Sequence, residues 1–575
     1  MPSPDAPTRF DDPSAPAACE APESGPAPAP RALPVDRRGF LQAVGTGAAA
    51  ALGLGSAGLR PEPAGARERE REREHGEPAA REGRRAAAWR VRVAAATLAS
   101  QRPRARQLAN GEERDTPYLA NYSKGLPHDA LGRVLPAAYR SLLRALESRD
   151  PRRFEQIQLG LGRKLTSPQA GLAFDLEGPD SHHLTIRPAP RIDSPWNSGE
   201  IAELYWMALA RDVHFSDYGL EAITAEALDD LSGFSDFRGP TQRGEVTPAT
   251  LFRGSTPGDL AGPWLSQLLW LDVPFGAQVI SQRNETALPG FAYLTGYDDW
   301  LAAQDGAELA GTDALDPERR YLRNLRDLAR WVQVDALYQA YLNACLILLG
   351  LGCPLNEGNP LKRSATQLGF AEWGGPHILS LVTEVATRAL KAVWYQKWFV
   401  HRRHRPENMG GLLHHHLTGA ATYPIDPEIL DSPVLDRVFR LTGTYLLPQA
   451  YPEGSPTHPS YGAGHATVAG ACVTILKAWF DESFEIADPV VASADGLSLE
   501  PFAGPPLTVG GELDKLATNV ATGRNGAGIH WRSDTSESLR LGERVAIGIL
   551  QEQALTHRQR PHLRFTSFDG ATVTI

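Results

Sequence analysis

The chain has 575 residues, of which 42% are hydrophobic and 22% charged, proportions typical of a folded soluble protein. Its 58 Lys and Arg residues against 68 Asp and Glu residues give a net charge of -10, which argues against a nucleic-acid partner. The length predicts one large enzyme domain preceded by a leader.

The N-terminal segment has the order of parts of an export signal. Residues 1–36 are rich in Pro and Ala, and such a composition cannot form a packed core. The sequence DRRGFL follows at Asp36–Leu41, then an uncharged run from Ala43 to Leu59, which is short for a membrane span, and the small residues Ala64–Ala66. An arginine pair before a modest apolar run resembles a twin-arginine signal. We therefore expect residues 1–66 to be an export signal and the mature protein to be periplasmic or extracellular.

Residues 67–85 alternate Arg and Glu, which indicates a solvated linker, and residues 86–575 form the expected folded domain. Apolar residues three and four positions apart predict helices in the segments 135–147, 200–212, 322–351, 376–402, 433–447 and 464–480. Pro- and Gly-rich stretches at 172–198, 237–262 and 448–464 predict long loops. The expected fold is mainly α, with a core of two four-helix-type bundles, long functional loops and little β structure.

Four cysteines and a triple histidine are candidate metal ligands of the cysteine and histidine type. Cys19 lies in the leader, and no CxxC pair occurs among the others, so no thiolate metal site is expected. Buried free thiols are favoured for Cys345, Cys353 and Cys472, while a disulfide between the first two stays open. Adjacent helical residues do not share a face, so His414–His416 are not expected to bind a metal together.

The first of three informative segments is WYQKWFVHRRHRP, from Trp394 to Pro406. Lys397 and Arg405 are eight residues apart, about two helical turns. Pro406 disfavours helix at Arg405, so the arginine is expected where the chain leaves the helix. Trp394 and Lys397 share a face. On its own, such a charge run indicates an exposed basic helix end.

The second and third segments could also bind an anion. HPSYGAGHAT begins at His458 and ends with a small-residue turn at the start of a predicted helix, where free N–H groups bind anions and His465 lies at the mouth. RNGAGIHWRSD begins at Arg524, whose planar guanidinium could clamp an oxyanion. In the same segment His530 offers a ring nitrogen as a ligand or nucleophile.

Together and in this order, the segments resemble the vanadium haloperoxidase and type-2 phosphatidic acid phosphatase superfamily. Its pattern is a Lys-to-Arg-Pro segment, a Pro-Ser-Gly-His-like segment, and an Arg-x5-His segment with a later Asp, here Asp534. The step from Lys397 to Arg405, the runs VWYQKW and HPSY, and the upstream runs ELYWMALARD and YQAY are similar to algal-type bromoperoxidases. The likeness covers most of residues 190–550.

The resemblance implies that hydrogen peroxide oxidises a halide, with bromide favoured, at a histidine-bound vanadate, yielding a hypohalous-acid equivalent. No haem or flavin is then needed. The residues implied to bind vanadate are Lys397, Arg405, Gly464, Arg524 and His530. His530 is implied as the vanadium ligand.

The same resemblance assigns catalytic roles to His465, His530 and Lys397. His465 would assist proton transfer, and Lys397 would polarise the bound peroxide. Trp394 and His458 resemble residues that line the halide side of bromoperoxidase pockets. Asp335, in a helix, is expected to hold the ring of His465, and either Asp534 or a backbone carbonyl is expected to hold a histidine ring nearby.

The sequence departs from the family pattern at one point. The usual Ser is replaced by Ala463 and the usual Pro by Gly462. Loss of the serine hydroxyl removes one hydrogen bond to an ion, worth about 1.5–3 kcal/mol if nothing compensates. Vanadate affinity is therefore the property that this departure puts in question.

The expected partners are hydrogen peroxide and a halide, with a small organic acceptor left open, and no nucleic acid. Family members are commonly homo-oligomers, so at least a dimer is expected. Two alternatives remain: an exported acid phosphatase with His530 as nucleophile and His465 as acid, and a non-catalytic relative that only binds an oxyanion.

Overall fold

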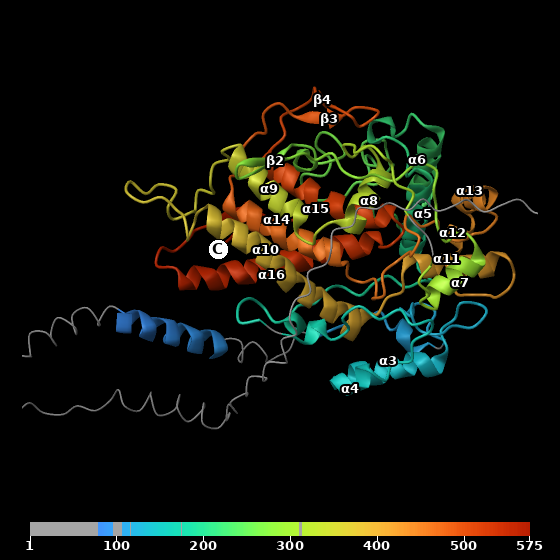
Figure 1. Ribbon diagram of the computed structural model, residues 1–575. Helices are drawn as coiled ribbons and strands as arrows, with labels where there is room; N and C mark the ends of the chain where they lie inside the picture. Colours follow the sequence, from blue (N-terminus) through green and yellow to red (C-terminus); the bar gives the residue numbers. More distant parts are fainter. Residues whose placement is uncertain (1–78, 96–105, 116, 174, 310–312) are drawn as a thin grey trace, which may run out of the picture. The chain divides into compact units, whose positions relative to one another are not determined.

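The structure is a computed structural model that describes residues 79–95, 106–115, 117–173, 175–309 and 313–575 (Figure 1). The predicted export signal over 1–66 and the linker as far as residue 78 lie outside the described residues. Residues 79–95 are helical, so this helix crosses the boundary expected at residue 86. Contacts between residues divide the chain into two units, Met1–Glu82 and Gly83–Ile575, and the second unit contains all three segments of the candidate site.

The mainly α fold is confirmed, with the elements in the following order along the chain. The helices are α3 (Pro136–Ser148), α4 (Pro151–Phe154), α5 (Pro195–Leu209), α6 (Ala222–Gly233), α7 (Tyr297–Gln304), α8 (Leu325–Val334), α9 (Gln339–Gly350), α10 (Gly375–Tyr395), α11 (Pro406–Leu417), α12 (Pro427–Leu430), α13 (Pro433–Thr442), α14 (Gly464–Trp479), α15 (Val509–Gly526) and α16 (Arg532–Thr556). The described strands form three two-stranded antiparallel sheets: β1 (Val273–Phe275) with β2 (Gln278–Ile280), β3 (Val490–Ala492) with β4 (Leu499–Pro501), and β5 (Arg564–Thr566) with β6 (Thr572–Thr574).

The core of the unit is a bundle of α10, α14, α15 and α16, with α8 against α15 and α9 against α10 (Figure 1). Helix α14 is buried along nearly its whole length. Glycines let α14 and α16 approach closely, since a Cβ at Gly470 would lie 2.1 Å from the Leu539 carbonyl oxygen and one at Gly542 2.0 Å from that of Thr467. The close approach fixes the N-terminal end of α14 relative to that of α16.

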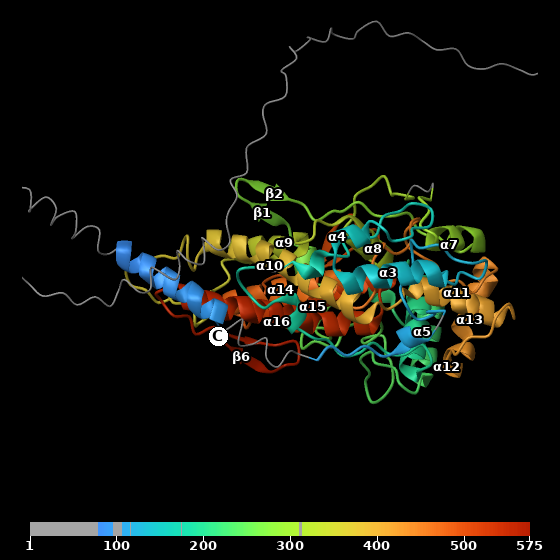
Figure 2. The same ribbon diagram turned by 90° about the horizontal axis from the view of Figure 1, so that it is seen from below.

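A second group of shorter helices packs around α5, with α6, α11, α12 and α13 as its neighbours (Figure 2). Ser194 caps α5 by accepting the Asn197 N–H, and Pro195 occupies its first turn, where a missing N–H costs nothing. The helix buries two carboxylates, Glu200 and Glu203. A buried carboxylate needs a cationic partner. The two carboxylates of α5 therefore pair with arginines from the segments that hold the candidate site.

The helix predicted over 322–351 is interrupted, which corrects the expectation. Helices α8 and α9 meet at an angle of 102° around Asp335, whose φ of -59° and ψ of 143° are not helical. Asp335 therefore caps the end of α8 instead of lying within a helix. Val334 and Tyr338 beside the break are exposed, so the apolar pattern there did not mark a buried face. In the described chain no single helix is long and apolar enough to cross a membrane, and this bent pair passes that test only when taken together.

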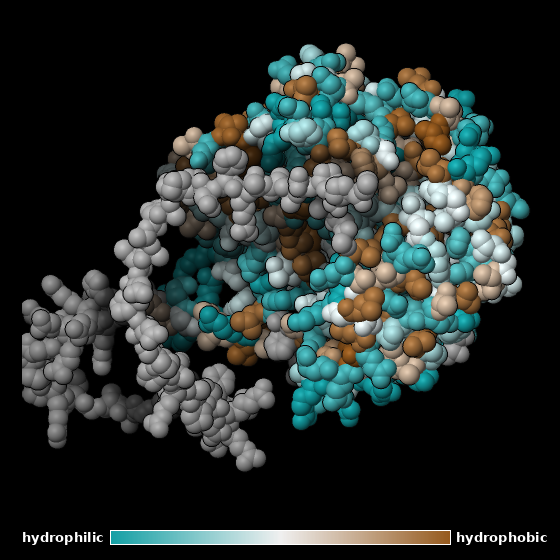
Figure 3. Space-filling model, turned by 45° about the vertical axis from the view of Figure 1, so that its right-hand side comes forward, coloured by the Kyte–Doolittle hydropathy of each residue, from teal (hydrophilic) through white to brown (hydrophobic). Residues whose placement is uncertain are grey.

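The described cysteines, Cys345, Cys353 and Cys472, are buried free thiols, as favoured from the sequence, and the alternative disulfide is not formed. Burial raises the pKa of both Cys345 and Cys353 to about 12, so these thiols are unreactive at neutral pH. Figure 3 shows a face on which hydrophilic and hydrophobic residues are interspersed. Leu368 and Phe370 are among the most exposed apolar side chains, at 92% and 71%.

Candidate active site

Lys397 lies in a π-helical turn that follows α10. The turn spans Gln396–His401, and Arg402 then adopts a left-handed conformation with φ of 43°. Single π turns are frequent at functional sites. The expectation that Pro406 keeps Arg405 out of a helix is confirmed, because Arg405 is extended (φ -87°, ψ 155°) before α11. The helical turn ends at His401, before two full turns after Lys397, so the eight residues from Lys397 to Arg405 do not form the two helical turns expected from the sequence.

The basic segment is buried, which contradicts its interpretation as an exposed helix end. Arg402 pairs with Glu113, and Arg403 pairs with Glu200 at 3.1 Å. Arg405 is 2% exposed and donates to main-chain carbonyls instead of a carboxylate. Distant parts of the chain thus supply the partners that local sequence does not reveal.

His530 is held with one ring nitrogen directed at a cation. Its Nδ1 lies 2.7 Å from a carboxylate oxygen of Asp534, which accepts only, so Nδ1 carries the proton. The lone pair is then on Nε2, 3.0 Å from a guanidinium nitrogen of Arg405. Asp534 also accepts from Ser460 and Arg403, which fixes the carboxylate. The ring therefore presents a neutral nitrogen suited to bind an electrophilic centre.

Three buried cations surround this nitrogen without a carboxylate partner among the described residues. Lys397 donates to the carbonyls of Pro459 and Ser460 at 2.7 and 2.9 Å. Arg524 donates to the Val332 carbonyl at 3.0 Å, while its Nε is buried and makes no hydrogen bond with the described chain. The third cation is Arg405.

Electrostatics show that these groups lie close enough to interact strongly. Burial and then the charges of Arg405 and Arg524 hold the pKa of Lys397 well below its usual range. Burial lowers the pKa of Arg405 to about 10; the charge of Arg524 adds to this shift, and the charge of Asp534 opposes it. The pKa of His530 is also held well below normal, by burial and then by Arg405, Lys397 and Arg524. An uncompensated excess of buried positive charge fits a multiply charged oxyanion.

His465 lies on the more open side of the site, in the first turn of α14. Its side chain is 24% exposed, whereas that of His530 is 2% exposed, so solvent reaches the site from the side of His465. Nε2 of His465 lies 3.0 Å from the carboxylate of Asp335 at the break between α8 and α9. An electrostatic interaction with His465 contributes to the lowered pKa of His530, so the two rings lie close to each other.

The rings of Trp394 and His458 lie against each other beside the cations, with centroids 4.8 Å apart and planes tilted by 43°. His458 Nδ1 lies 2.9 Å from Arg405, and burial followed by the charges of Lys397 and Arg405 holds its pKa well below normal. The ring is therefore neutral. The Lys397 ammonium lies 5.6 Å from the Trp394 ring centroid. The structure brings both residues to the site, and their role toward a halide stays a prediction.

Ala463 is the N-cap residue of α14, and its side chain forms no cap. The two hydroxyls that could replace the missing serine are already engaged: Ser460 donates to Asp534, and Thr467 donates to the Ala463 carbonyl at 2.8 Å. Gly464 follows, and a Cβ there would lie 3.3 Å from the Trp394 ring. The main chain can thus approach an anion closely at Gly464.

Sequence reasoning missed Arg403, which connects the site to α5. The guanidinium contacts Asp534 at 3.2 Å and Glu200 at 3.1 Å, and its Cζ lies 4.3 Å from the Trp531 ring centroid. Arg403 thereby holds the carboxylate that holds His530. The only available signal was its place in the HRRHR run, where the role of each arginine cannot be assigned from spacing.

A buried ion pair behind Arg405 was also missed. Glu407, in the first turn of α11, accepts from Lys124 at 2.8 Å, from Gln304, and from both the N–H and the hydroxyl of Ser455 at 2.6 and 2.7 Å. Ser455 lies shortly before His458 along the chain. The pair therefore fastens the loop that carries His458 to the helix that follows Arg405.

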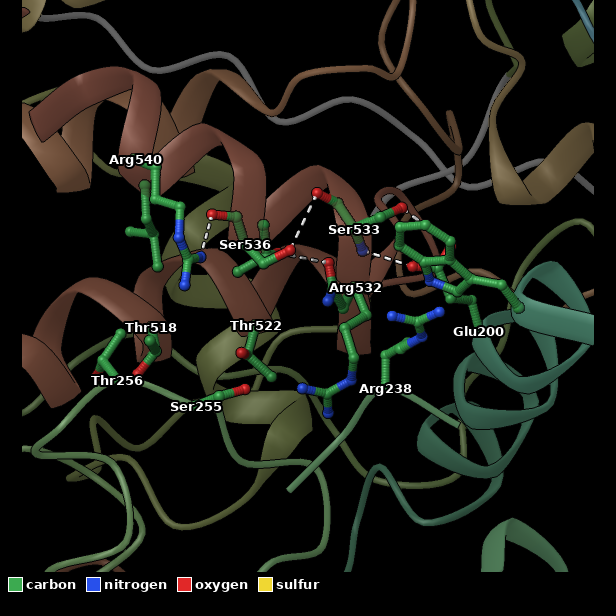
Figure 4. A pocket seen from close by; sticks show the side chains of 15 residues that line it. Glu200, Arg238, Ser255, Thr256, Thr518, Thr522, Arg532, Ser533, Ser536 and Arg540 are labelled. Carbon is green, nitrogen blue, oxygen red and sulfur yellow. Dashed lines mark hydrogen bonds between the residues drawn. The ribbon is translucent and has the colours of Figure 1, made fainter. Parts of the chain in front are cut away.

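A second, hydroxyl-rich pocket of about 60 Å³ lies beside the start of α16 (Figure 4). Glu200 there accepts the Ser533 N–H at 2.6 Å. Its cations are all matched by carboxylates, in the pairs Arg238–Asp236, Arg532–Glu203 and Arg540–Asp569. Balanced charge does not favour an anion, so this pocket is distinct from the cation-rich site.

The histidines His414–His416 do not converge on a common point. Nδ1 of His414 accepts the Tyr445 N–H, Nδ1 of His416 accepts the Tyr423 N–H, and Nε2 of His415 bonds the Tyr297 hydroxyl. Their separate partners agree with the expectation that these residues are not a shared metal site.

Comparison with known proteins defines the family. The model of the VCPO second helical-bundle domain matches residues 444–558. Vanadium-dependent bromoperoxidases of Corallina pilulifera and Corallina officinalis are each 40% identical over 86% of this chain and 99% of their own length. A solved homohexameric structure of the second vanadate-dependent bromoperoxidase of Ascophyllum nodosum superimposes with a TM-score of 0.81 at 29% identity, covering 92% of this chain and 95% of that one. The chain belongs to the vanadium-dependent bromoperoxidase family.

Proposed function

We propose that this protein is a vanadium-dependent bromoperoxidase that oxidises bromide with hydrogen peroxide to a hypobromous-acid equivalent. The observation that carries the proposal is the neutral Nε2 of His530, fixed through Asp534 and surrounded by three buried cations for which the described residues provide no carboxylate partner. Relatives of the same class cover most of the chain. The phosphatase and non-catalytic alternatives are not favoured by these relatives.

The residues of the site fit a bound vanadate. Lys397, Arg405 and Arg524 would neutralise its oxygens, and the Gly464 N–H would add a donor. His530 would ligate vanadium through Nε2. When bound, vanadate supplies the Lewis-acidic centre at which peroxide is activated toward halide.

The chain's own groups would then manage protons and access. His465 lies at the open side, and because its Nε2 contacts Asp335, which orients the ring, its Nδ1 would accept or deliver the proton exchanged when peroxide enters. Lys397 would polarise the bound peroxide. Trp394 and the neutral His458 would line the halide approach. Released hypobromous acid would halogenate a small organic acceptor.

One experiment tests the reaction class. Purified protein is loaded with vanadate and assayed in parallel for bromide-dependent bromination of a phenol and for hydrolysis of a phosphate ester. We expect bromination that requires both vanadate and hydrogen peroxide. Hydrolysis by the vanadate-free protein without bromination would instead establish the phosphatase.

We further propose that Ala463→Ser tightens vanadate binding. A hydroxyl at this N-cap can donate to a vanadate oxygen, and the hydroxyls of Ser460 and Thr467 already donate elsewhere. One hydrogen bond to an ion of about 1.5–3 kcal/mol corresponds to a gain of roughly ten- to a hundredfold. Titration of the vanadate-free protein with vanadate measures the change.

The serine introduced at position 463 could instead cap α14, so the test must distinguish two outcomes. Capping alone would stabilise the vanadate-free protein by about 0.5–2 kcal/mol and leave the affinity unchanged. Thermal unfolding without vanadate detects it. An unchanged affinity would mean that Ala463 does not face the oxyanion.

We also propose that the leader directs twin-arginine export to the periplasm or beyond. Changing Arg37→Lys together with Arg38→Lys keeps the charge of the segment and should leave folded protein in the cytoplasm, because the signal is the arginine pair itself. Fractionation of a bacterial host that expresses both forms measures the effect. Continued export of the lysine form would show that another route recognises the leader.

We propose a homo-oligomer of at least two copies. The Ascophyllum relative is described as homohexameric, and apolar side chains such as Leu368 and Phe370 are exposed in the single chain. Light scattering of the purified protein should give a mass above that of one chain, and a monomer at micromolar concentration would contradict the proposal.

A further inference from the structure

A group of metal-ligating side chains lies outside the site described above. Asp180, His182 and His183 each offer one ligand atom, and these atoms all lie within 4.8 Å of one another. Asp180 precedes a single 3-10 turn, Ser181–His183, which contains both histidines, and all three residues are partly exposed, so an ion from solvent can reach the group.

Neither the Asp180 carboxylate nor Nε2 of His183 is needed to hold the turn together. Asp180 is the N-cap residue, but its carboxylate makes no capping bond, and the turn is closed by the main chain, through the His183 N–H and the Asp180 carbonyl at 3.0 Å. Nε2 of His183 is buried and has no hydrogen-bond partner in the described chain. A buried ring nitrogen without a partner is costly, and a bound ion is one way to satisfy it.

The turn is anchored firmly enough to present ligands in a fixed arrangement. The Gln107 side chain donates to the carbonyls of His182 and Leu184 at 3.1 and 2.9 Å, and the buried Gln396 donates to the latter at 2.7 Å. The rings of His182 and His183 lie side by side, with centroids 4.2 Å apart. Gln396 immediately precedes Lys397, so the anchor belongs to the same π-helical turn as the site lysine.

We propose that Asp180, His182 and His183 form a binding site for a late first-row divalent cation such as Zn²⁺ or Cu²⁺. Two imidazoles and one carboxylate are the ligands that these ions prefer, whereas Ca²⁺ and Mg²⁺ require more oxygen atoms than the group offers. Small side-chain rotations bring the ligand atoms to the spacing around a tetrahedral ion, with the fourth position left to water. The site binds a cation and is thus chemically distinct from the oxyanion site.

The test is Zn²⁺ titration of the vanadate-loaded, chelator-treated protein prepared without a polyhistidine tag, followed by calorimetry. We expect saturable binding of one ion per chain. Since groups that only orient a ligand are worth about 10–100-fold in metal affinity, His182→Gln, His183→Gln and Asp180→Asn should each weaken binding by at least about tenfold. His416→Gln, in the triple histidine, is the matched control and should leave the affinity unchanged.

Electron paramagnetic resonance of the protein with one equivalent of Cu²⁺ gives a second measurement. Nitrogen hyperfine splitting from two imidazoles is expected, and it should fall to one in either His variant. Circular dichroism confirms that the variants are folded. The proposal is overturned if Zn²⁺ binds no tighter than millimolar, or if the three variants bind as the unchanged protein does.

Discussion

His530→Ala is expected to abolish vanadium retention and bromide oxidation together. The Nε2 of this ring bears a lone pair, is fixed through Asp534, and faces the three cations. The other ring near the metal position, His465, uses its Nε2 to contact Asp335. Loss of a direct ligand should weaken vanadate binding by more than about 100-fold, because groups that merely orient a ligand already account for about 10–100-fold. Vanadium content after gel filtration and bromide oxidation measure both effects.

His458→Ala is the matched control for this change. Both rings are buried and lie 2.9–3.0 Å from Arg405, but only His530 is proposed as the ligand. His458→Ala should therefore retain vanadium. Added imidazole should partly restore vanadium binding to His530→Ala, because the truncation leaves room for the missing ring. An active His530→Ala protein with one vanadium per chain would refute the site assignment.

Glu407→Gln is expected to lower the free energy of unfolding by about 3–5 kcal/mol, the usual cost of removing one partner of a buried ion pair. Lys124 and Glu407 are 2% and 1% exposed, and the change leaves the lysine without its countercharge. The amide also places a donor where the carboxylate accepted from Gln304 and Ser455. Urea unfolding at neutral pH measures the loss.

The pH dependence of this pair has a definite sign. Burial alone would raise the pKa of Glu407, but Lys124 and the hydrogen bonds from Ser455 lower it below its ordinary value. A carboxyl with a depressed folded-state pKa contributes stability that is present above the pKa of the unfolded chain and lost as the pH falls through the folded-state pKa. The stability difference between the original protein and Glu407→Gln should therefore shrink in acid.

Two further variants separate charge from packing. Lys124→Met combined with Glu407→Gln removes both charges and should recover part of the stability lost by Glu407→Gln alone. Glu226→Gln makes the same chemical change in the exposed pair with Arg437, where both partners are more than a third exposed, and should cost no more than about 1 kcal/mol. Equal losses of stability at both positions would show that the cost of Glu407→Gln does not come from the burial of its ion pair with Lys124.

The sequence by itself determined the class of fold, the three segments of the candidate site, and the local conformation at its key points. Apolar periodicity identified α3, α10 and α14, because these helices each bury one or more continuous faces. Proline at 406 placed Arg405 in an extended conformation, because the clash between a proline ring and the preceding residue is local. Such effects depend only on neighbours along the chain.

Helices α15 and α16 were not predicted, although they carry Arg524 and Asp534. Both bury charged side chains, which hides the apolar pattern. In α15, Asp514 pairs with Lys477 of α14, a partner 37 residues away. Burial of such groups is possible only once a distant residue satisfies them.

The resemblance pointed to Arg405, but only the tertiary structure shows that the HRRHR run is buried and what its other arginines do. Arg402 forms an ion pair with Glu113, and Arg403 forms ion pairs with Glu200 and Asp534. Arg405 donates to main-chain carbonyls and faces the oxyanion position. The break that directs Asp335 to His465 was likewise invisible in the periodicity of residues 322–351. The physical reason is that a charge is stable in the interior only beside its partner, and these partners come together from positions more than 100 residues apart.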